Sequence, residues 1–364
     1  MLSSCRDGCV SVIGGAAGLA WQGAGRACIS AGMSITTPPL GPSPAILFVT
    51  ATRIGDAVLS TGLLQHLVER YRDARFTIAA GPVSAPLFQG VPGLERLVAL
   101  KKRSYARHWL DLYRQVAPRR WDMVVDLRGS ALAWLVRARH RRVTAKGDPT
   151  EHRVVQLGKL FHLAPPPAPH LWLTPPHEVA GERLVPMQGA PVLGIGPTAN
   201  WAGKQWRAER FAELAMRLTA PGSVLAGARI AVFSAPHERE LAAPVLEAVP
   251  AERLIDVTRE PDLLSVAGAL RHLRLFIGND TGLMHMAAAV GTPTLGLFGP
   301  SPATQYSPWG PHAAVAQTEI PYAELCSGPD FDHRTTGTLM DSLSVDRAEA
   351  AALGLLQRRR GVAA

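Results

Sequence analysis

Cysteine is scarce in this chain of 364 residues, and its placement excludes several classes of protein. Three of the four cysteines (Cys5, Cys9 and Cys28) lie close to the N-terminus, so Cys326 is the only one in the rest of the chain. One thiol cannot crosslink a domain, and no Cys-x-x-Cys pair is present to bind zinc or to exchange disulfides. We therefore expect a cytoplasmic protein without a disulfide framework, a structural zinc site or a catalytic cysteine.

A long hydrophobic run is also missing. Residues 8–25 carry no formal charge, but they include six glycines, and their apolar part is shorter than the roughly 20 residues that cross a membrane. Asp7 stands where a secretion signal carries only positive charge. The sequence thus predicts no membrane span. We expect residues 1–44 to be disordered, or to be an extension that results from a mis-assigned translation start, with Met33 as the alternative start.

Acidic residues are few in one part of the chain. The whole sequence has a net charge of +9, whereas residues 96–153 hold fifteen basic and five acidic residues, a net charge of +10. This basic segment is either a solvated face or a surface that attracts a phosphorylated acceptor or anionic lipid headgroups, each cation gaining on the order of 1 kcal/mol near an anionic membrane. It lacks the interleaved aromatic residues of a single-strand binder and any helix-turn-helix or zinc signature. We expect no nucleic-acid partner.

Buried-strand patterns alternate with amphipathic helical patterns along most of the chain, as in a protein built from strand–helix–strand units. In the first half the predicted strands cover residues 45–51, 75–80, 94–100 and 121–127, and the predicted helices 57–71, 130–138 and 151–162. In the second half the predicted strands cover residues 192–196, 228–233, 273–278 and 292–299, and the predicted helices 208–219, 237–248, 263–270, 281–290 and 345–360.

The predicted fold is of the α/β class, with two Rossmann-like parallel-sheet domains facing each other across a cleft. Residues 165–191 contain eight prolines, which are excluded from helix interiors and central strands, so we assign them to an interdomain linker. The linker separates an N-terminal domain (45–164) from a C-terminal domain (192–344), which residues 345–364 follow as a C-terminal helix.

Ligands of open parallel sheets bind beyond the carboxyl ends of the strands, so the turns that follow the strands are the candidate sites. The turn after the first strand reads TRIGDAVLSTG (52–62). Gly55 allows a tight corner there. Asp56 either caps the next helix and complements its dipole, or faces the cleft as a general base.

The equivalent turn of the second domain, GIGPTANWAGKQW (194–206), is a candidate anion site. Its glycines, Asn200 and Lys204 suit a diphosphate, with Lys204 as a point charge. The Gly-Lys-Ser/Thr sequence that ends the phosphate-binding loop of nucleoside triphosphatases is absent. The turn after the predicted strand 228–233 covers residues 234–241. Its Glu238 either accepts hydrogen bonds from a ribose or belongs to a solvated helix start.

The most specific stretch is FIGNDTGLMHMAAAVGTPTLGLFGPS (276–301). We predict Asp280 as the N-cap of a helix whose first backbone N–H groups, those of Thr281, Gly282 and Leu283, bind a phosphate. A carboxylate facing a diphosphate would repel it, so Asp280 should cap the helix or bind sugar hydroxyls. His285 is either a packing residue or part of the site.

A metal site is not expected. Asp330-Phe-Asp332 is the only Asp-x-Asp in the chain and has His333 beside it, but it follows the last predicted strand, far in sequence from the phosphate loops. Two carboxylates and a neighbouring histidine are weak grounds for a bound cation.

Taken together, these motifs resemble glycosyltransferase family 9, the bacterial heptosyltransferases, over about residues 45–355. The resemblance is carried by Arg53-Ile-Gly-Asp56, by Lys204-Gln-Trp206 followed by Glu209-Arg-Phe211, by Ala235-Pro-His-Glu238, and by Asn279-Asp-Thr-Gly-Leu-Met-His285 with its alanine run. It implies the fold called GT-B, and transfer of a heptose from an ADP-linked donor to a lipopolysaccharide core acceptor at the inner face of the cytoplasmic membrane.

By position, the resemblance implies that Asp56 is the general base, that Lys204 contacts the diphosphate and that Glu238 binds the ribose. It assigns Asp280, Thr281, Gly282 and Leu283 to the donor sugar and diphosphate, and places Asn200 near phosphate. His285 matches the motif without a defined role. Arg207 departs from the family, which often has proline there, and the chain after Pro321 keeps only Cys326 where some heptosyltransferases are cysteine-rich.

The sequence therefore predicts an inverting, metal-independent glycosyltransferase that uses no cofactor, since the ADP-sugar is its substrate. Its predicted partners are the nucleotide sugar and an anionic, lipid-linked acceptor at the membrane surface, and the enzyme is expected to be a monomer, cytoplasmic or peripheral on the membrane. Two alternatives remain open: a transferase of the same family with another nucleotide sugar, and a sugar-nucleotide-binding module without catalysis.

Overall fold

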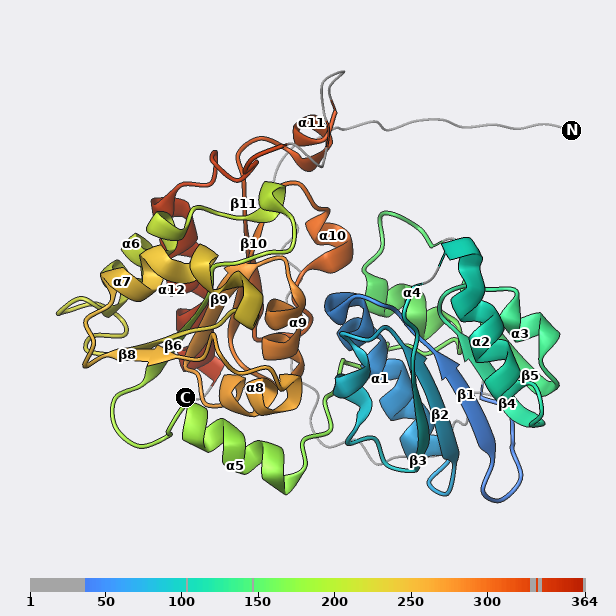
Figure 1. Ribbon diagram of the computed structural model, residues 1–364. Coiled ribbons are helices and arrows are strands. Elements are labelled where there is room, and N and C mark those ends of the chain that lie inside the picture. Colours follow the sequence, from blue (N-terminus) through green and yellow to red (C-terminus); the bar gives the residue numbers. More distant parts are fainter. Residues whose placement is uncertain (1–36, 103, 146, 328–331, 333–335, 363–364) are drawn as a thin grey trace, which may run out of the picture. The chain divides into compact units, whose positions relative to one another are not determined.

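Two parallel sheets carry the fold in the computed structural model, which describes residues 37–102, 104–145, 147–327, 332 and 336–362 (Figure 1). Sheet A has the strand order β3-β2-β1-β4-β5, and sheet B has the order β11-β10-β9-β6-β7-β8. Every neighbouring pair in both sheets is parallel. The predicted α/β class with two Rossmann-like parallel sheets is confirmed.

Sheet A and its helices form what we call the N-terminal lobe. Its strands are β1 (Ala45–Val49), β2 (Arg75–Ala80), β3 (Leu94–Ala99), β4 (Trp121–Asp126) and β5 (Ala138–Val143). The completely buried β1 alternates its side chains between the two faces, with Ile46 and Phe48 in one hydrophobic cluster and Leu47 and Val49 in another. The first cluster includes residues of α1 (Ile54–Arg70) and α4 (Arg153–Lys159), and the second those of α2 (Arg107–Val116) and α3 (Leu132–Leu135).

Sheet B and its helices form the C-terminal lobe. Its strands are β6 (Val192–Gly196), β7 (Arg229–Val232), β8 (Leu254–Asp256), β9 (Leu275–Asn279), β10 (Thr294–Phe298) and β11 (Ala313–Gln317). One face packs on α6 (Ala208–Thr219), α7 (Ala243–Ala248) and α12 (Val345–Val362), and the other on α8 (Leu263–Leu270) and α9 (Gly282–Ala289). The shorter elements are η1 (Ala85–Phe88), η2 (Ser104–Ala106), η3 (Ala202–Lys204), η4 (Pro236–Ala242), α10 (Ala303–Tyr306) and α11 (Tyr322–Leu325).

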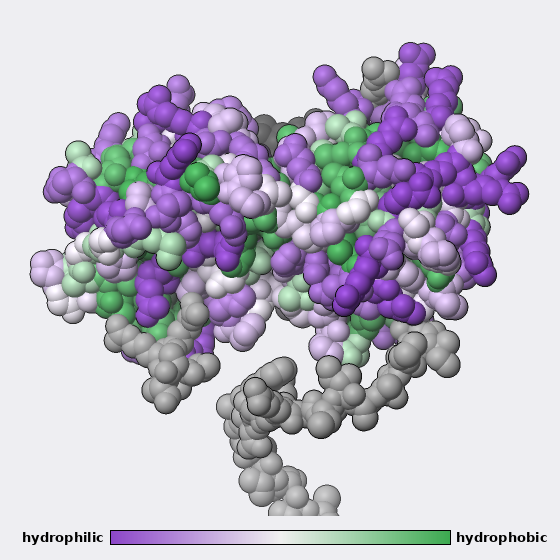
Figure 2. Space-filling model, turned by 90° about the horizontal axis from the view of Figure 1, so that it is seen from below, coloured by the Kyte–Doolittle hydropathy of each residue, from purple (hydrophilic) through white to green (hydrophobic). Residues whose placement is uncertain are grey.

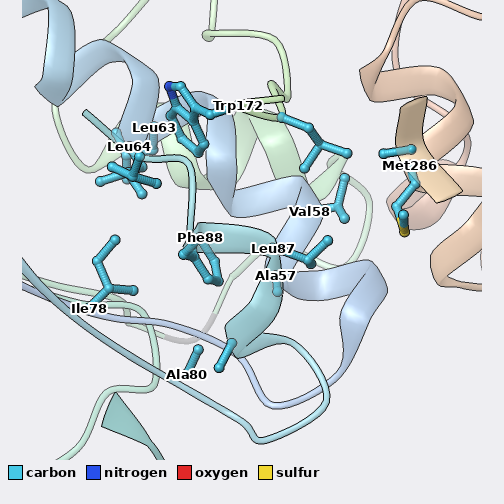
Figure 3. Packing of buried hydrophobic residues seen from close by; sticks show 14 of the residues in the cluster. Ala57, Val58, Leu63, Leu64, Ile78, Ala80, Leu87, Phe88, Trp172 and Met286 are labelled. Atoms are coloured by element: carbon cyan, nitrogen blue, oxygen red, sulfur yellow. The ribbon is translucent and has the colours of Figure 1, made fainter. Parts of the chain in front are cut away.

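The two lobes share a hydrophobic core. Val58 of α1 and Leu87 of η1 belong to the same buried cluster as Met286 of α9, and Figure 3 shows these side chains pointing toward one another. Helices α1 and α9 are in direct contact, and both sheets lie in one compact unit. On the molecular surface, hydrophilic side chains dominate the face that Figure 2 shows, with hydrophobic residues between them.

The strands that the sequence did not predict all lie at sheet edges. The eight predicted strands are present, but β5, β8 and β11 were missed. The helix predicted over 130–138 is too long, because α3 covers only four residues and β5 begins at Ala138. Strand β5 reads ARHRRV and is only half-buried. An edge strand pairs on one side only and tolerates charge, so it lacks the hydrophobic signal of a central strand.

The proline-rich stretch 165–191 contains a helix that the sequence analysis did not foresee, α5 (Pro175–Leu184). Its two prolines occupy the first turn, where the missing N–H groups have no partner in any helix. Thr174 and His177 form a capping box there, and the helix packs against α8. The domain and linker boundaries themselves stay predictions.

Most of the stretch 1–44 for which we expected disorder or a mis-assigned start lies outside the described residues, namely residues 1–36. Of the remainder, Pro38 accepts a hydrogen bond from the Tyr71 hydroxyl at 2.5 Å, and Thr37 Oγ1 lies 3.2 Å from His66 Nε2. None of the helices that the structure describes has the length and apolar character of a membrane span.

The strand order itself locates the candidate site. Sheet B, read from β8, has the Rossmann order 3-2-1-4-5-6, which reverses between β6 and β9. Sheet A reverses in the same way between β1 and β4. Ligands of such sheets bind beyond the carboxyl ends of the strands at this reversal. The turns after β1, β6 and β9 are the ones that carry Asp56, Lys204 and Asp280.

Candidate active site

Asn279, the last residue of β9, joins the two turns at the reversal point of sheet B. Its side chain is fully buried, accepts a hydrogen bond from the Trp206 backbone N–H at 3.1 Å and donates one to the Pro197 carbonyl at 2.9 Å. Both partners lie in the segment after β6. The amide therefore fixes the Lys204 turn beside the end of β9, a role that the sequence analysis did not assign.

Lys204 and Asp280 form a close ion pair at this point. Lys204 Nζ lies 2.5 Å from Asp280 Oδ2, and the Asp280 side chain is only 7% exposed. The predicted N-cap role of Asp280 is wrong: the N-cap of α9 is Thr281, and no side chain caps the helix. The carboxylate is directed instead to the ammonium from the neighbouring turn, because a buried charge requires a partner.

His285 flanks the same carboxylate. Its Nε2 lies 3.6 Å from Asp280 Oδ1, and its buried Nδ1 has no hydrogen-bond partner among the described residues. Burial by itself disfavours ionisation of Asp280, but the imidazole of His285 and the ammonium of Lys204 outweigh it and hold the pKa of Asp280 well below its usual value. Asp280 is therefore a carboxylate at neutral pH.

The N-termini of α1 and α9 approach each other through two glycines. A Cβ on Gly55 would lie 2.8 Å from His285 Cδ2, and one on Gly282 would lie 2.5 Å from Ile54 Cγ2. No side chain fits at either position without a shift of its neighbour. Because the first N–H groups of a helix lack intrahelical partners and the dipole is positive there, the start of α9 with Thr281, Gly282 and Leu283 is suited to an anion.

Asp56 lies in the first turn of α1, opposite these groups. The N-cap of α1 is Arg53, and Asp56 makes no capping hydrogen bond. Among the described residues we find no hydrogen bond or ion pair to its half-buried carboxylate. The residues before it, Ile54 and Gly55, lie against Gly282 and His285 of α9, so the first turn of α1 faces the C-terminal lobe. The carboxylate has lone pairs available for a proton or a ligand.

The two other predicted binding residues lie at the same edge of sheet B. Glu238, in η4 after β7, accepts a hydrogen bond at 2.7 Å from the hydroxyl of Thr198, which follows β6. Asn200 is exposed two residues further on. Thr198 was not predicted as a site residue, since a single threonine after a strand carries no distinctive signal.

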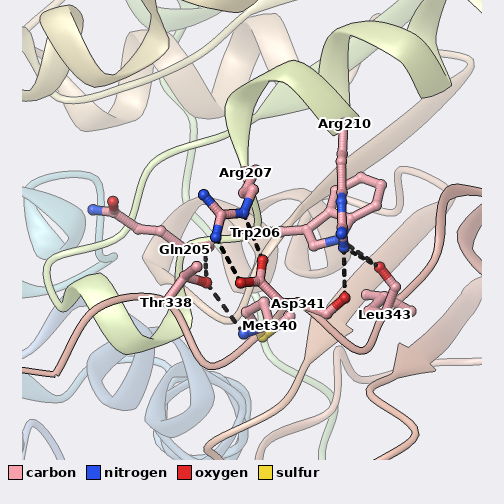
Figure 4. Close-up of polar contacts among 8 residues, drawn as sticks. All are labelled: Gln205, Trp206, Arg207, Arg210, Thr338, Met340, Asp341 and Leu343. Carbon is pink, nitrogen blue, oxygen red and sulfur yellow. Dashed lines mark hydrogen bonds and ion pairs between the residues drawn. The ribbon is translucent and has the colours of Figure 1, made fainter.

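A segment near the C-terminus supports the Lys204 turn, and the sequence did not reveal it. Arg207 pairs with Asp341 through two bonds of 2.6 Å, Thr338 bonds the Gln205 carbonyl at 2.5 Å, and Arg210 bonds the carbonyls of Asp341 and Leu343 (Figure 4). The Trp206 indole donates to the Leu343 carbonyl at 2.9 Å. Arg207, where the resembling family often has proline, thus has a partner of its own in this chain.

Within the described ranges, no group of three or more His, Cys, Asp or Glu side chains could hold a metal ion. Asp330 and His333, weighed as a metal site from the sequence, lie outside the described residues. The expectation that the chain uses no metal stays a prediction.

This arrangement can bind an anion on one side and accept a proton on the other. An ammonium and helix N–H groups converge at the end of sheet B. A carboxylate with no partner among the described residues lies in the first turn of α1, which contacts the start of α9. Donors aimed at a departing anion stabilise developing charge by several kcal/mol, and a positioned base contributes about 10²- to 10⁴-fold. The geometry suits attack of an alcohol on a carbon atom from which a phosphate or diphosphate anion departs.

Comparison with known proteins identifies relatives of this chain. Residues 165–328 match the model of Glycosyltransferase family 9 (heptosyltransferase). A lipooligosaccharide heptosyltransferase 2 of Campylobacter jejuni is 24% identical over 269 residues, which cover 71% of this chain and 82% of that protein. The resemblance inferred from the motifs is confirmed.

Solved structures agree in fold. A glycosyltransferase family 9 protein of Veillonella parvula has a TM-score of 0.72 at 20% identity, covering 88% of this chain and all of that one. An ADP-heptose lipopolysaccharide heptosyltransferase II of Escherichia coli has a TM-score of 0.67 at 19% identity, covering 87% of this chain and 99% of that one. The predicted GT-B fold is confirmed.

Proposed function

Because this chain is a glycosyltransferase of family 9, we propose that it transfers a heptose from ADP-heptose to a lipopolysaccharide core acceptor. The observation that carries the proposal is that an anion site and a carboxylate lie close together at the carboxyl ends of the strands. Lys204 and the start of α9 are suited to the donor diphosphate, and Asp56 faces them without a partner among the described residues.

The proposed reaction inverts the donor configuration and needs no metal. Asp56 takes the proton from an acceptor hydroxyl, whose oxygen forms a bond to the anomeric carbon from the side opposite the diphosphate. The bond between that carbon and the diphosphate oxygen breaks, and its electron pair leaves with ADP. Lys204 and the amides of Gly282 and Leu283 stabilise the departing charge, while Asp280 keeps the ammonium in place.

ADP-heptose is favoured as donor by a relative, and one local feature suits the ribose of any nucleotide sugar. The E. coli structure is named as an ADP-heptose enzyme. Glu238 lies half-buried after β7, held by Thr198, where an acidic residue of a Rossmann-like sheet bonds a ribose. We propose that Glu238 binds the ribose of the donor and that Asn200 lies near its diphosphate.

The acceptor is proposed to be lipid-linked and anionic, with the enzyme bound as a monomer to the inner face of the cytoplasmic membrane. The basic segment belongs to the N-terminal lobe, as Asp56 does. Within it, Tyr105 is 94%, Trp134 68% and Leu135 64% exposed. Aromatic and aliphatic side chains among arginines are typical of surfaces that bind at the headgroup level of a membrane.

A transfer assay tests the reaction. The purified enzyme is incubated with radiolabelled ADP-heptose and membranes that carry a truncated lipopolysaccharide core, and the label in the lipid fraction is counted. Parallel thermal-shift measurements with ADP-, UDP- and GDP-sugars identify the donor, since a ligand at about 100 times its Kd stabilises by roughly 2.7 kcal/mol. Stabilisation by a UDP- or GDP-sugar alone would indicate another donor. Stabilisation by ADP-heptose without transfer would indicate a binding module.

Vesicle sedimentation tests the membrane surface. Replacing Trp134 and Leu135 by serine should reduce binding to vesicles that contain anionic lipid. The matched control replaces Val179 and Met187, two exposed hydrophobic residues on or after α5 that lie outside the basic segment, by serine. Equal binding of all three proteins would contradict the proposed surface.

A further inference from the structure

A turn of the C-terminal lobe contacts the N-terminal lobe through one histidine. The chain between β10 and β11 passes through α10 and then reaches Ser307 and Trp309. The Nε2 atom of His152, the N-cap of α4, lies 2.9 Å from the Ser307 carbonyl oxygen, and its ring lies 4.7 Å from the ring of Trp309. A hydrogen bond and a ring contact therefore join a helix of one lobe to a turn of the other.

The ring of His152 is held in one orientation by its own helix. Its Nδ1 accepts a hydrogen bond from the backbone N–H of Val154 at 3.2 Å. Because Nδ1 is an acceptor, the ring is neutral and its proton is on Nε2, which donates to the Ser307 carbonyl. The bond to Ser307 is thus directional, and it defines where the turn of the C-terminal lobe lies relative to the start of α4.

The same turn is attached to its own lobe on both sides of Trp309. A Cβ on Gly296 of β10 would lie 3.1 Å from Pro308 Cδ, so the proline ring packs directly on the strand. The Nε2 atom of His312 lies 2.9 Å from the Ala288 carbonyl oxygen of α9. The position of the turn therefore follows that of α9, the helix whose start belongs to the anion site.

The contact at His152 is separate from the one between α1 and α9, where Gly55 and Gly282 let the two helix starts approach. The hydrophobic core that the lobes share holds them together, but burial of apolar surface is not directional. A single close contact leaves the lobes free to rotate about it, whereas a second, directional contact restricts that rotation. Helix α4 packs against α1, whose first turn carries Asp56. The contact at His152 therefore bears on the orientation of the turn that carries Asp56.

We propose that His152 is a positioning residue for the transfer reaction, because its contact with Ser307 holds the lobe that carries Asp56 in a fixed orientation toward the donor site. The inference rests on the proposed function, in which the base and the anion site come from different lobes. Lys204, Asp280 and the start of α9 all belong to the C-terminal lobe, so ADP binding does not need the contact. The chemical step does, because a misplacement of about 1 Å can lower a rate by about 10²-fold.

His152→Asn separates the contact between the lobes from the helix cap. Asparagine is a favourable N-cap, so α4 keeps its cap, but the shorter side chain cannot reach the Ser307 carbonyl or pack on Trp309. The kcat of transfer should fall by about 10- to 10²-fold, while the Kd of ADP in a calorimetric titration stays within about 2-fold of the wild-type value. An unchanged kcat, or equal losses in kcat and in ADP affinity, would overturn the proposal.

His152→Gln is the rescue variant. The amide of glutamine reaches about as far from the backbone as Nε2 does and can donate to Ser307, but glutamine is not a favourable N-cap. This variant should have a higher kcat than His152→Asn and a lower unfolding free energy. If kcat followed the order of stability instead, the loss in His152→Asn would come from folding and the proposal would be wrong.

His312→Asn is the matched control. It removes a contact of the same kind and length, between a histidine Nε2 and a backbone carbonyl oxygen, from the same turn, but both partners lie in the C-terminal lobe. This variant should keep the wild-type kcat. A loss as large as that of His152→Asn would show that the turn itself is needed, rather than its contact with the N-terminal lobe.

Distances between two spin labels test the inference without transfer. Leu110 of α2 and Leu241 of η4, which are 47% and 48% exposed and lie in different lobes, are replaced by cysteine in a chain whose native cysteines are serine. His152→Asn should broaden the distribution of distances, and His312→Asn should not. A distribution that stays unchanged in His152→Asn would overturn the inference. A broadened distribution in a protein that transfers no sugar would refute the proposed function alone, and His152 would remain the residue that fixes the lobes.

Discussion

The carboxylates of Asp56 and Asp280 both follow a central strand, yet their surroundings are opposite. Asp280 is buried, paired with Lys204 and flanked by His285, and the pKa of its carboxyl is lowered. Asp56 is half-buried at the start of α1 and has no hydrogen bond or ion pair with the described part of the chain.

This difference separates two tasks that look alike in sequence. A carboxylate committed to an ammonium is a poor proton acceptor, because protonation would leave the buried cation unpaired. A carboxylate without a partner can take a proton in the transition state. In the proposed reaction, the C-terminal lobe therefore holds a fixed electrostatic site and the N-terminal lobe supplies the base.

Replacing the unpaired acid should have the largest effect. Asp56→Asn keeps the size of the side chain but removes the base, so kcat should fall by about 10²- to 10⁴-fold while the affinity for ADP stays nearly unchanged. The measurement is steady-state kinetics combined with calorimetric titration of ADP. A variant that retains the wild-type kcat would show that Asp56 is not the base.

Replacing the paired acid should affect stability first. Asp280→Asn leaves Lys204 without its counter-ion and should lower the free energy of unfolding by about 3 kcal/mol at neutral pH. Because the folded-state pKa of Asp280 is lowered, its contribution is complete above the unfolded pKa of about 3.9 and is lost as the pH falls through the folded value.

The difference between wild type and Asp280→Asn in urea unfolding should therefore shrink as the pH is lowered below about 4. Asp346→Asn is the control, because Asp346 pairs with Arg217 while 83% exposed and should contribute little. A difference that does not change with pH would contradict the assigned ion pair.

A substitution at the contact between the starts of α1 and α9 should have the next largest effect. Gly282→Ala places a Cβ 2.5 Å from Ile54 Cγ2, so α1 and α9 must separate, at a cost of about 1–3 kcal/mol in unfolding free energy. Gly354→Ala in α12 is the control: only Arg358 Nη1, at 3.9 Å, is near, and alanine should stabilise the helix by up to about 1 kcal/mol. Thermal or urea unfolding of both variants measures the contrast. If Gly282→Ala proves as stabilising as Gly354→Ala, the close approach of α1 and α9 does not exist.

The sequence predicted the central strands of both sheets but missed strands at their edges. Strands such as β1 and β9 are buried on both faces, so their hydrophobic runs are unmistakable. Strand β5 carries arginines because one of its sides needs no partner. Helix α5 was missed because its prolines, which forbid a helix interior, occupy its first turn.

Within the site, the sequence indicated which residues follow strands but not which of them meet. Asp280 was predicted as a helix cap, and only the packing of two turns shows its pairing with Lys204. Asn279 and Thr198 act through contacts between separate turns. His152 and Ser307 come from different lobes, so no local pattern could connect them.

The smallest effect is expected when a second ion pair is broken, because this pair is exposed whereas that of Asp280 is buried. Arg207 and Asp341 are 54% and 46% exposed, and exposed pairs contribute about 0–1 kcal/mol even with two good bonds. Arg207 has a φ of −57°, which proline adopts without strain, and its backbone N–H donates to no described residue. Arg207→Pro should therefore change the unfolding free energy by less than about 1 kcal/mol and leave ADP affinity intact, in urea titrations run beside Asp280→Asn. A loss as large as that of Asp280→Asn would mean that the segment around Asp341, rather than the buried pair, holds the Lys204 turn in place.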